Sequence, residues 1–371
     1  MHVKERKIAR IILNDGTELL GNSIGKEGTT IGEIVFSTSM TGYIETLTDK
    51  SYFGQIVVQT FPSVGNYGIN KEDYEGEKPV LKGYIVKNCC QNPSNNREKE
   101  NLNEWLIKNN IVGIEKIDTR FLTKKIRENG VLNGAITTEK IENKKALLEK
   151  INNFKIENAI EETSTKKIKI FENKENSAKN CVICLLDFGV KNSIVENLLK
   201  RATKVFLMPY NTTKEEIEKI KPNGIVLSNG PGDPKENLTI IENIKKITTL
   251  NIPIFGICMG HQLLALSNGA KTEKLKYGHR GCNQPVLDLK TGKISITSQN
   301  HGYYVVEKTI NRKNVKISHI NINDKTCEGL EYLNFPAFSV QFHPEASAGP
   351  KDTNFLFDRF FELIKTNKFE N

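Results

Sequence analysis

The second half of the chain alternates between short apolar runs and longer segments with helical spacing. From residue 180 onward, each strand-like run is followed by a segment that favours a helix. The strands are predicted at 181–186, 205–209, 224–227 and 252–257, and the helices at 193–201, 214–220 and 235–248. Parallel strands need long crossover connections, which helices usually supply. The alternation therefore predicts, for 180–371, an α/β domain with a mostly parallel sheet and helices on both faces.

The first part of the chain has a different pattern and predicts a smaller α+β domain over residues 1–140. Its strand-like runs include 8–13, 55–60 and 83–87, and 101–109 and 120–129 favour helices. Residues 141–179 are rich in Lys, Glu and Asn and contain few aromatic side chains. We expect this segment to begin with a helix and to end as an exposed connector between the two domains.

Composition excludes several classes of protein. The chain carries 53 basic and 44 acidic residues, a net charge of +9, but only 9 of the basic residues are Arg. Recognition of phosphates and bases favours the forked Arg side chain, so we expect a solvated Lys-rich surface and no nucleic-acid partner. No apolar run of 18 residues is present, which predicts no membrane-spanning helix.

Cysteine usage and the N-terminus point to a cytoplasmic protein. Seven cysteines, an odd number in a chain of this length, favour reduced thiols. The N-terminal residues lack the apolar core of a signal peptide. Cys181 and Cys184 form a C-x-x-C pair, but the pair lies inside an apolar strand with no second pair at zinc-like spacing. We read it as part of the core and predict no metal site.

The strongest candidate for chemistry is Cys258, which follows the apolar run 252–257. Gly256 and Gly260 flank it in the pattern G-x-C-x-G, and a helix-like segment follows at once. This is the strand–turn–helix pattern of a nucleophile elbow, with cysteine in place of serine. The turn is crowded, so glycine is needed on both sides. The N-terminus of a helix also favours a thiolate.

A second candidate set follows the predicted strand 337–342. His343 and Glu345 are separated by Pro344, which should end the strand. Residues two apart in an extended segment point to the same side, so the two side chains can share a face. A Cys–His–carboxylate set is a general way to activate a nucleophile. A capped strand end with a satisfied histidine is the alternative.

Two polar loops also follow predicted strands. Residues 228–234 read SNGPGDP and form a rigid loop whose amide groups can face a developing oxyanion. Residues 299–303 read QNHGY after the alternating run 294–298. There, Asn300 and backbone groups can bind a polar substrate. Each loop can also be an ordinary turn.

Together, these motifs resemble the class I (triad) glutamine amidotransferases. The matching stretches are GICMGHQ at 256–262, NGPGDP at 229–234, NHGY at 300–303 and HPE at 343–345. The N-terminal part resembles the corresponding domain of the small, glutamine-hydrolysing subunits of carbamoyl-phosphate synthetases. That resemblance rests on FSTSMTGY at 36–43, LTDKSY at 47–52, GNYG at 65–68 and IDTRFLT at 117–123. It extends over nearly the whole chain and fades between about 140 and 180.

The resemblance implies a role for each matching residue. Cys258 would attack the glutamine side-chain amide to give a γ-glutamyl thioester, His343 would act as general base and acid, and Glu345 would orient His343. The residues implied in binding glutamine are Ser51, Gly230, Gly232, Met259, Gln262, Asn300, Gly302 and Tyr303. Met259 stands where the family often has leucine, and Tyr303 where phenylalanine is usual. Both roles lean on backbone atoms, so we expect activity to survive these differences.

The family also implies a partner. Its large subunit uses ATP and Mg²⁺ to make carbamoyl phosphate from bicarbonate, for arginine or pyrimidine synthesis. The present chain has no G-x-x-x-x-G-K-[ST] loop, so we expect it to bind no cofactor itself. Three alternatives stay open: a glutaminase serving another synthetase, a stand-alone Cys–His hydrolase, and a silent binding subunit. The N-terminal motifs disfavour the first, and the intact Cys258, His343 and Glu345 disfavour the last.

Overall fold

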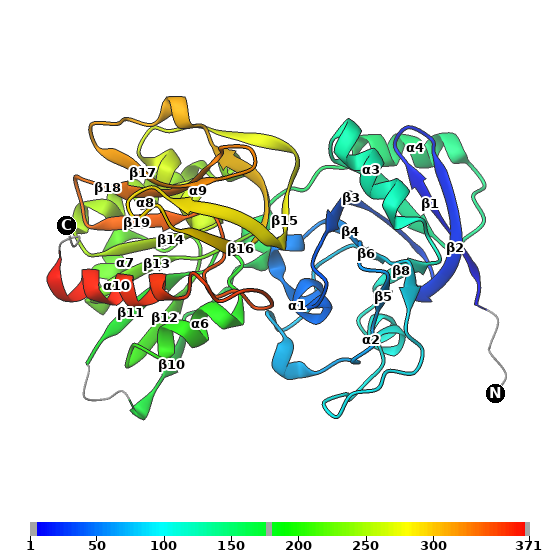
Figure 1. Cartoon of the computed structure of the whole chain (residues 1–371), viewed down its shortest axis with the longest axis horizontal. Helices are drawn as coiled ribbons and strands as arrows, with labels where there is room; N and C mark the ends of the chain where they lie inside the picture. Colours follow the sequence, from blue (N-terminus) through cyan, green and yellow to red (C-terminus); the bar gives the residue numbers. More distant parts are fainter. Residues whose placement is uncertain (1–5, 176–179, 368–371) are drawn as a thin grey trace. The chain divides into compact units, whose positions relative to one another are not determined.

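The computed structural model describes residues 6–175 and 180–367, which form two compact units, Met1–Glu157 and Asn158–Asn371 (Figure 1). Three short stretches lie outside the described residues: 1–5 at the start of the predicted N-terminal domain, 176–179 at the end of the predicted connector, and 368–371. Each unit is built around its own sheet and has its own hydrophobic core.

The N-terminal unit contains a closed barrel in the order β1-β2-β8-β6-β4-β3-β9, closed by antiparallel pairing of β1 with β9. Its strands are β1 (Ile8–Leu13), β2 (Glu18–Gly25), β3 (Thr29–Ser37), β4 (Gln55–Gln59), β6 (Gly83–Ile85), β8 (Val112–Glu115) and β9 (Leu132–Thr137). A separate two-stranded ladder joins β5 (Ser63–Val64) and β7 (Asn88–Cys89). The mixture of strands and helices confirms the predicted α+β class, but closure into a barrel depends on strand pairing that no local pattern reveals.

The α-helices described in this unit are α1 (Tyr43–Thr48), α2 (Leu102–Lys108), α3 (Thr119–Asn129) and α4 (Lys144–Asn153). Of these, α2, α3 and α4 begin where a side chain accepts a hydrogen bond from an amide of the first turn, whereas α1 follows Gly42 and has no such cap. Asn101, Asp118 and Asn143 each accept a hydrogen bond from a backbone amide three residues later, at 2.9–3.0 Å. Such caps contribute about 1 kcal/mol each and fix where α2, α3 and α4 start.

The C-terminal unit is organised by a ten-stranded sheet in the order β10-β12-β11-β13-β14-β19-β18-β16-β15-β17. The strands are β10 (Lys169–Glu172), β11 (Val182–Leu186), β12 (Lys204–Met208), β13 (Gly224–Leu227), β14 (Ile254–Ile257), β15 (Thr272–Asp288), β16 (Ile294–Val305), β17 (Val315–Asn321), β18 (Cys327–Tyr332) and β19 (Ala337–Val340). The five strands from β12 to β19 run parallel, and the strands on either side of them pair antiparallel. The predicted α/β fold with a parallel sheet is confirmed for these five central strands, whereas the strands outside them form antiparallel pairs that the alternation did not predict.

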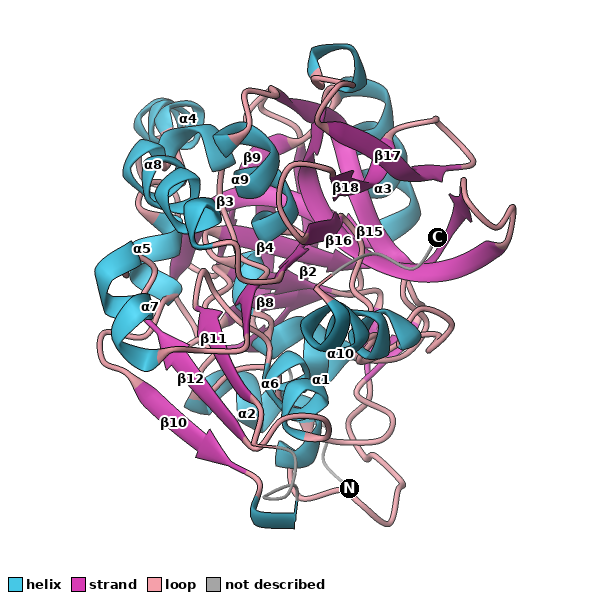
Figure 2. Ribbon diagram, turned by 90° about the vertical axis from the view of Figure 1, so that its left-hand side faces the viewer, coloured by secondary structure: helices cyan, strands magenta, loops and turns pink. Residues whose placement is uncertain are grey.

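Alternate residues of the central strands point into two separate cores. Cys184 and Leu186 of β11 belong to one core, and Ile183 and Leu185 belong to the other. The first core includes residues of α5 (Ala159–Thr163), α7 (Lys214–Ile220), α8 (Leu238–Ile247) and α9 (Met259–Ser267); the second includes α6 (Asn192–Leu199) and α10 (Phe355–Thr366). Figure 2 shows α6 and α7 on opposite sides of β11 and β12. Helices therefore cover both faces, as the alternation predicted.

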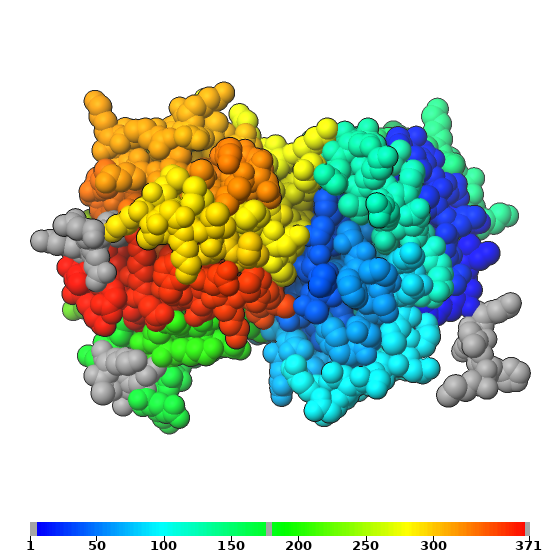
Figure 3. All heavy atoms as spheres, viewed as in Figure 1, coloured from blue at the N-terminus to red at the C-terminus, as the bar shows by residue number. Residues whose placement is uncertain are grey.

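The segment predicted as a connector contains regular structure. Residues of α4 pack in the N-terminal unit, whereas α5 and β10 belong to the C-terminal unit, where β10 pairs antiparallel with β12. On the face of the C-terminal unit drawn in Figure 3, red atoms of the C-terminal segment lie between green atoms from the first part of this unit and yellow atoms from its middle part. Cys184 is fully buried, which places this half of the C-x-x-C pair in the core.

Candidate active site

Cys258 occupies a strained turn between β14 and α9. Its φ is +52°, in the region that side-chain-bearing residues rarely adopt. A Cβ on Gly260 would lie 2.2 Å from the Leu227 carbonyl oxygen, and one on Gly256 would lie 3.0 Å from the Gly260 backbone. The Cys258 amide donates to Val340 O, and the Gly260 amide donates to Ser228 O, both at 2.9 Å. The predicted elbow and its need for two glycines are therefore present in the structure.

His343 and Glu345 follow β19, which lies directly beside β14 in parallel register. The His343 Nδ1 and Glu345 Oε1 atoms are 2.6 Å apart, and both side chains are buried. The His343 amide donates to Ser298 O at 2.9 Å, which ties this segment to β16. Adjacent parallel strands thus deliver the thiol and the His–Glu pair to the same edge of the sheet.

The protonated form of His343 and the ionised form of Glu345 are both favoured, although both side chains are buried. Burial alone would lower the pKa of His343, but Glu345 and Cys258 outweigh it and raise the pKa to about 10. Burial would raise the pKa of Glu345, but His343 and Lys191 lower it to about 2. His343 Nε2 is buried and makes no conventional hydrogen bond to a side chain or backbone group within residues 6–175 and 180–367. It is the ring nitrogen left for the thiol.

Asn300, Gly302 and Tyr303 lie within β16. The sequence suggested a loop or turn here, but β16 continues to Val305 and pairs with β15. Cys258 Sγ lies 3.8 Å from Asn300 O. The two motifs are therefore brought together, although the backbone at 300–303 is extended rather than turned.

The loop at 229–232 packs tightly against the loop after β11. A Cβ on Gly230 would lie 2.1 Å from Phe188 O, and Gly232 has a φ of +90°. The Asn229 side chain accepts from the Lys191 amide at 3.1 Å and donates to Gly189 O at 3.2 Å. These contacts fix the loop next to the segment that carries Lys191.

Comparison with known proteins agrees with this geometry. Residues 184–363 match the family model described as glutamine amidotransferase class-I. Residues 11–136 match the model described as carbamoyl-phosphate synthase small chain, CPSase domain. A carbamoyl phosphate synthase small chain of Bacillus cereus is 48% identical over 361 residues, which cover 97% of each chain. The chain belongs to the carbamoyl phosphate synthase small chain family.

Other relatives agree over the same length. The carbamoyl phosphate synthase pyrimidine-specific small chain of Bacillus subtilis is 47% identical and covers 97% of each chain. A carbamoyl phosphate synthase small chain of Listeria monocytogenes is 47% identical over 95% of this chain and 96% of its own. Within the described part of this small chain, no helix is long and apolar enough to cross a membrane.

Lys191 is a residue of this small chain that sequence reasoning missed. Its Nζ lies 3.2 Å from Glu345 Oε1 and donates to Ser347 O at 2.9 Å, and its side chain is buried. Lys191 is also the N-cap of α6, where a lysine opposes the helix dipole and replaces the usual Ser, Thr, Asp or Asn. No signal in the sequence indicated this role, because the helix was predicted to begin at residue 193 and the N-cap position of Lys191 is visible only in the structure.

Gln341 is the second missed residue. It is fully buried, and its Nε2 lies 3.7 Å from Cys258 Sγ. Gln262 Nε2 donates to Gln341 Oε1 at 2.9 Å and to Tyr303 O at 2.7 Å. Gln262 therefore holds the elbow helix to β16 and to the end of β19. The apolar run that predicts the strand gave no indication that the Gln262 and Gln341 side chains are hydrogen-bonded to each other.

The remaining predicted residues are Met259 and Ser51. Met259 begins α9 and is buried in the core formed with α7 and α8. Ser51 belongs to the N-terminal unit, in a 3₁₀ helix at Lys50–Tyr52, where its amide donates to Asp49 Oδ1 at 2.8 Å. Its contact with glutamine stays a prediction.

Proposed function

We propose that this small chain hydrolyses L-glutamine and passes the ammonia to a large ATP-dependent synthetase subunit, which makes carbamoyl phosphate from bicarbonate. The observation that carries the proposal is the placement of Cys258, on a strained elbow at the end of β14, beside the buried His343–Glu345 pair after β19. Family membership supports the choice of substrate and product.

The geometry suits a thioester mechanism. His343 accepts the Cys258 proton, and the thiolate attacks the side-chain carbonyl carbon of glutamine. Collapse of the tetrahedral intermediate breaks the C–N bond, and His343 gives its proton to the departing ammonia. Water, deprotonated by His343, then attacks the γ-glutamyl thioester and releases glutamate and the thiol. Glu345 stabilises the imidazolium at each stage, because its carboxylate contacts Nδ1.

Backbone groups near the elbow would stabilise the oxyanion and bind the substrate. We assign this role to Gly230, Gly232 and Met259, whose amides belong to the rigid loop and to the first turn of α9. Asn300, Gly302 and Tyr303 of β16 would border the glutamine site, with Gln262 positioning them. The role of Ser51 in binding glutamine rests on the family resemblance alone.

ATP and Mg²⁺ belong to the large subunit in this proposal, and the two subunits form a heterodimer in the cytoplasm. This chain would bind no cofactor for glutamine hydrolysis. Carbamoyl phosphate would serve arginine synthesis, pyrimidine synthesis or both; the name of the Bacillus subtilis relative specifies pyrimidines for that protein.

Glutamate release by the complex tests the proposal. We expect wild-type protein to release glutamate from glutamine and Cys258→Ser to lose roughly 10³-fold or more of this activity. Synthesis of carbamoyl phosphate from added ammonia should survive in the same variant, because the large subunit is intact. Wild-type glutamate release by Cys258→Ser would contradict the proposal, and Cys282→Ser is a matched control that removes a different thiol.

A further inference from the structure

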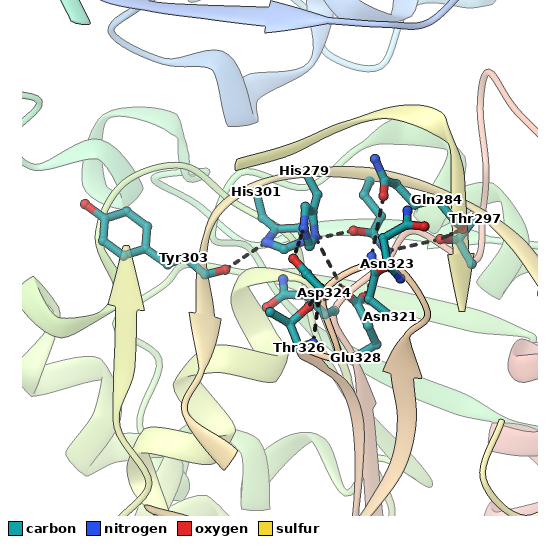
Figure 4. A network of polar contacts seen from close by, with 12 residues as sticks. His279, Gln284, Thr297, His301, Tyr303, Asn321, Asn323, Asp324, Thr326 and Glu328 are labelled. Atoms are coloured by element: carbon teal, nitrogen blue, oxygen red, sulfur yellow. Dashed lines mark hydrogen bonds and ion pairs between the residues drawn. The ribbon is translucent and has the colours of Figure 1, made fainter. Parts of the chain in front are cut away.

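Three buried side chains from three strands converge in the antiparallel part of the C-terminal sheet. They are His279 of β15, His301 of β16 and Glu328 of β18, and each offers a donor atom within 4.8 Å of the other two. Figure 4 shows the two rings beside each other, with Glu328 and Asp324 next to them. The three residues are far apart in the sequence, so no short sequence motif contains them.

His279 points one nitrogen into the cluster without a hydrogen bond. Its Nε2 lies 2.8 Å from Asp324 Oδ2, so a neutral ring donates there and leaves a lone pair on Nδ1. Nδ1 is buried, makes no hydrogen bond with a described residue, and lies 3.6 Å from Glu328 Oε1. A histidine whose far nitrogen donates to a carboxylate is the usual arrangement for a metal ligand.

His301 is oriented in the same way by a backbone carbonyl. Its Nδ1 lies 2.8 Å from Tyr303 O and must donate to it, which leaves a lone pair on Nε2 in the neutral ring. His301 Nε2 therefore also presents a lone pair to the cluster.

Gln299 presents a further oxygen to the same space. Its Nε2 donates to Glu328 Oε2 at 2.9 Å and to Thr297 Oγ1 at 3.1 Å, while the Thr297 hydroxyl is used on Gln284 O. These partners fix the amide orientation and turn Gln299 Oε1 toward His301 Nε2, 3.0 Å away. Two acceptors that face each other at this distance need a positive charge between or beside them, which either a metal ion or a second proton on the His301 ring supplies.

We propose that His279 Nδ1, His301 Nε2 and Glu328 bind a divalent transition-metal ion such as Zn²⁺, with Gln299 Oε1 as the fourth donor. Two imidazoles with oxygen donors suit zinc, and ligands about 2.1 Å from a tetrahedral ion lie about 3.4 Å from one another. The 3.0 Å and 3.6 Å separations between donor pairs are close to this spacing. A buried ion with four protein donors has no open coordination position, so its role would be to stabilise the fold. It would hold β15, β16 and β18 together next to Asn300 and Tyr303.

A proton is the competing occupant. Burial would lower the pKa of His279, but Asp324 and Glu328 raise it to about 9, and this proton would sit where the metal binds. A divalent ion must displace it, and the carboxylates that attract the proton also attract the ion. The experiment must therefore separate a metal from an imidazolium.

Metal content of the full chain gives the first test. We would use a Cys258→Ser background, strip the protein with a chelator, add Zn²⁺ and remove excess metal. We expect about one tightly held Zn²⁺ per chain, the ratio for a single site. Glu328→Gln and His279→Gln should each weaken binding at least ~100-fold, and Asp324→Asn roughly 10–100-fold through the second shell. His319→Gln is the matched control, a buried histidine outside the cluster, and should bind like the parent.

Cobalt spectroscopy on the same Cys258→Ser chain tests the site without altering the cluster. Co²⁺ bound by nitrogen and oxygen should show visible d–d absorption and no thiolate charge-transfer band. Failure to retain metal, equal retention in Glu328→Gln, or a thiolate band from another cysteine would each overturn the proposal. Metal content is measured without glutamine, so its result is independent of the proposed glutaminase function; only the effect on Asn300 and Tyr303 rests on that function.

Discussion

At the scale of single residues, the site contains buried charged side chains, and each is stabilised in its ionised form by an oppositely charged neighbour. Glu345 is buried, which would favour its neutral form, yet His343 and Lys191 lie close enough to favour the carboxylate. The carboxylate in turn favours the imidazolium of His343. Removal of any one member leaves another buried charge without its partner, which is costly.

Lys191→Met tests this dependence. We expect a loss of unfolding free energy of about 3 kcal/mol, the range for breaking a buried pair, and a lower kcat for glutamate release. The cause is a Glu345 carboxylate that loses one counter-charge. Urea denaturation and a glutamate assay measure the two effects. Lys293→Met removes a lysine at an exposed position and should change neither quantity. Unchanged stability and unchanged kcat in Lys191→Met would contradict the contact between Lys191 and Glu345.

The raised pKa of His343 predicts a pH dependence of stability. A group whose pKa is higher in the folded state stabilises the fold below its ordinary value of 6.5, and this contribution is lost as pH rises toward about 10. We expect the difference in unfolding free energy between wild type and His343→Gln to fall between pH 6.5 and 10. Urea denaturation across this range checks it. A difference that grows with pH would show that the sign is wrong.

At the scale of elements, the order of strands and helices in the C-terminal unit follows from sequence periodicity. The elbow and the strand before His343 were predictable because apolar runs end at Cys258 and near Pro344. Lys191 and Gln341 were not, since a buried lysine and a buried amide depend on partners distant in sequence. The closed barrel and the continuous β16 also depend on pairing between strands, which local propensity does not specify.

Gly260→Ala probes the tight contact between the elbow helix and β13. The added methyl group would overlap Leu227 O, so α9 must move. We expect a loss of about 1–3 kcal/mol in unfolding free energy and loss of glutaminase activity. Gly269→Ala provides the comparison, because its Cβ would meet no atom within 4 Å and only its φ of +87° is unfavourable. Equal activity in both variants would contradict the packing argument.

At the scale of the whole molecule, two compact units lie on one chain whose family operates as a small chain of a synthase. We expect the native complex, isolated through this chain, to contain one large ATP-dependent synthetase. Mass spectrometry identifies the partner, and a carbamoyl phosphate assay with glutamine identifies the product. A different synthetase would keep the chemistry of Cys258 but replace the product, and glutamine hydrolysis with no partner would indicate a stand-alone hydrolase.

The most direct test of the central claim is to trap the covalent intermediate. We would quench the complex with acid during glutamine turnover and examine peptides of this chain by mass spectrometry. We expect a γ-glutamyl group on Cys258, lost on treatment with hydroxylamine as a thioester should be, and absent from Cys258→Ser. A γ-glutamyl group on another residue, or turnover with no adduct on Cys258 even when deacylation is slowed by cooling, would contradict Cys258 as the nucleophile.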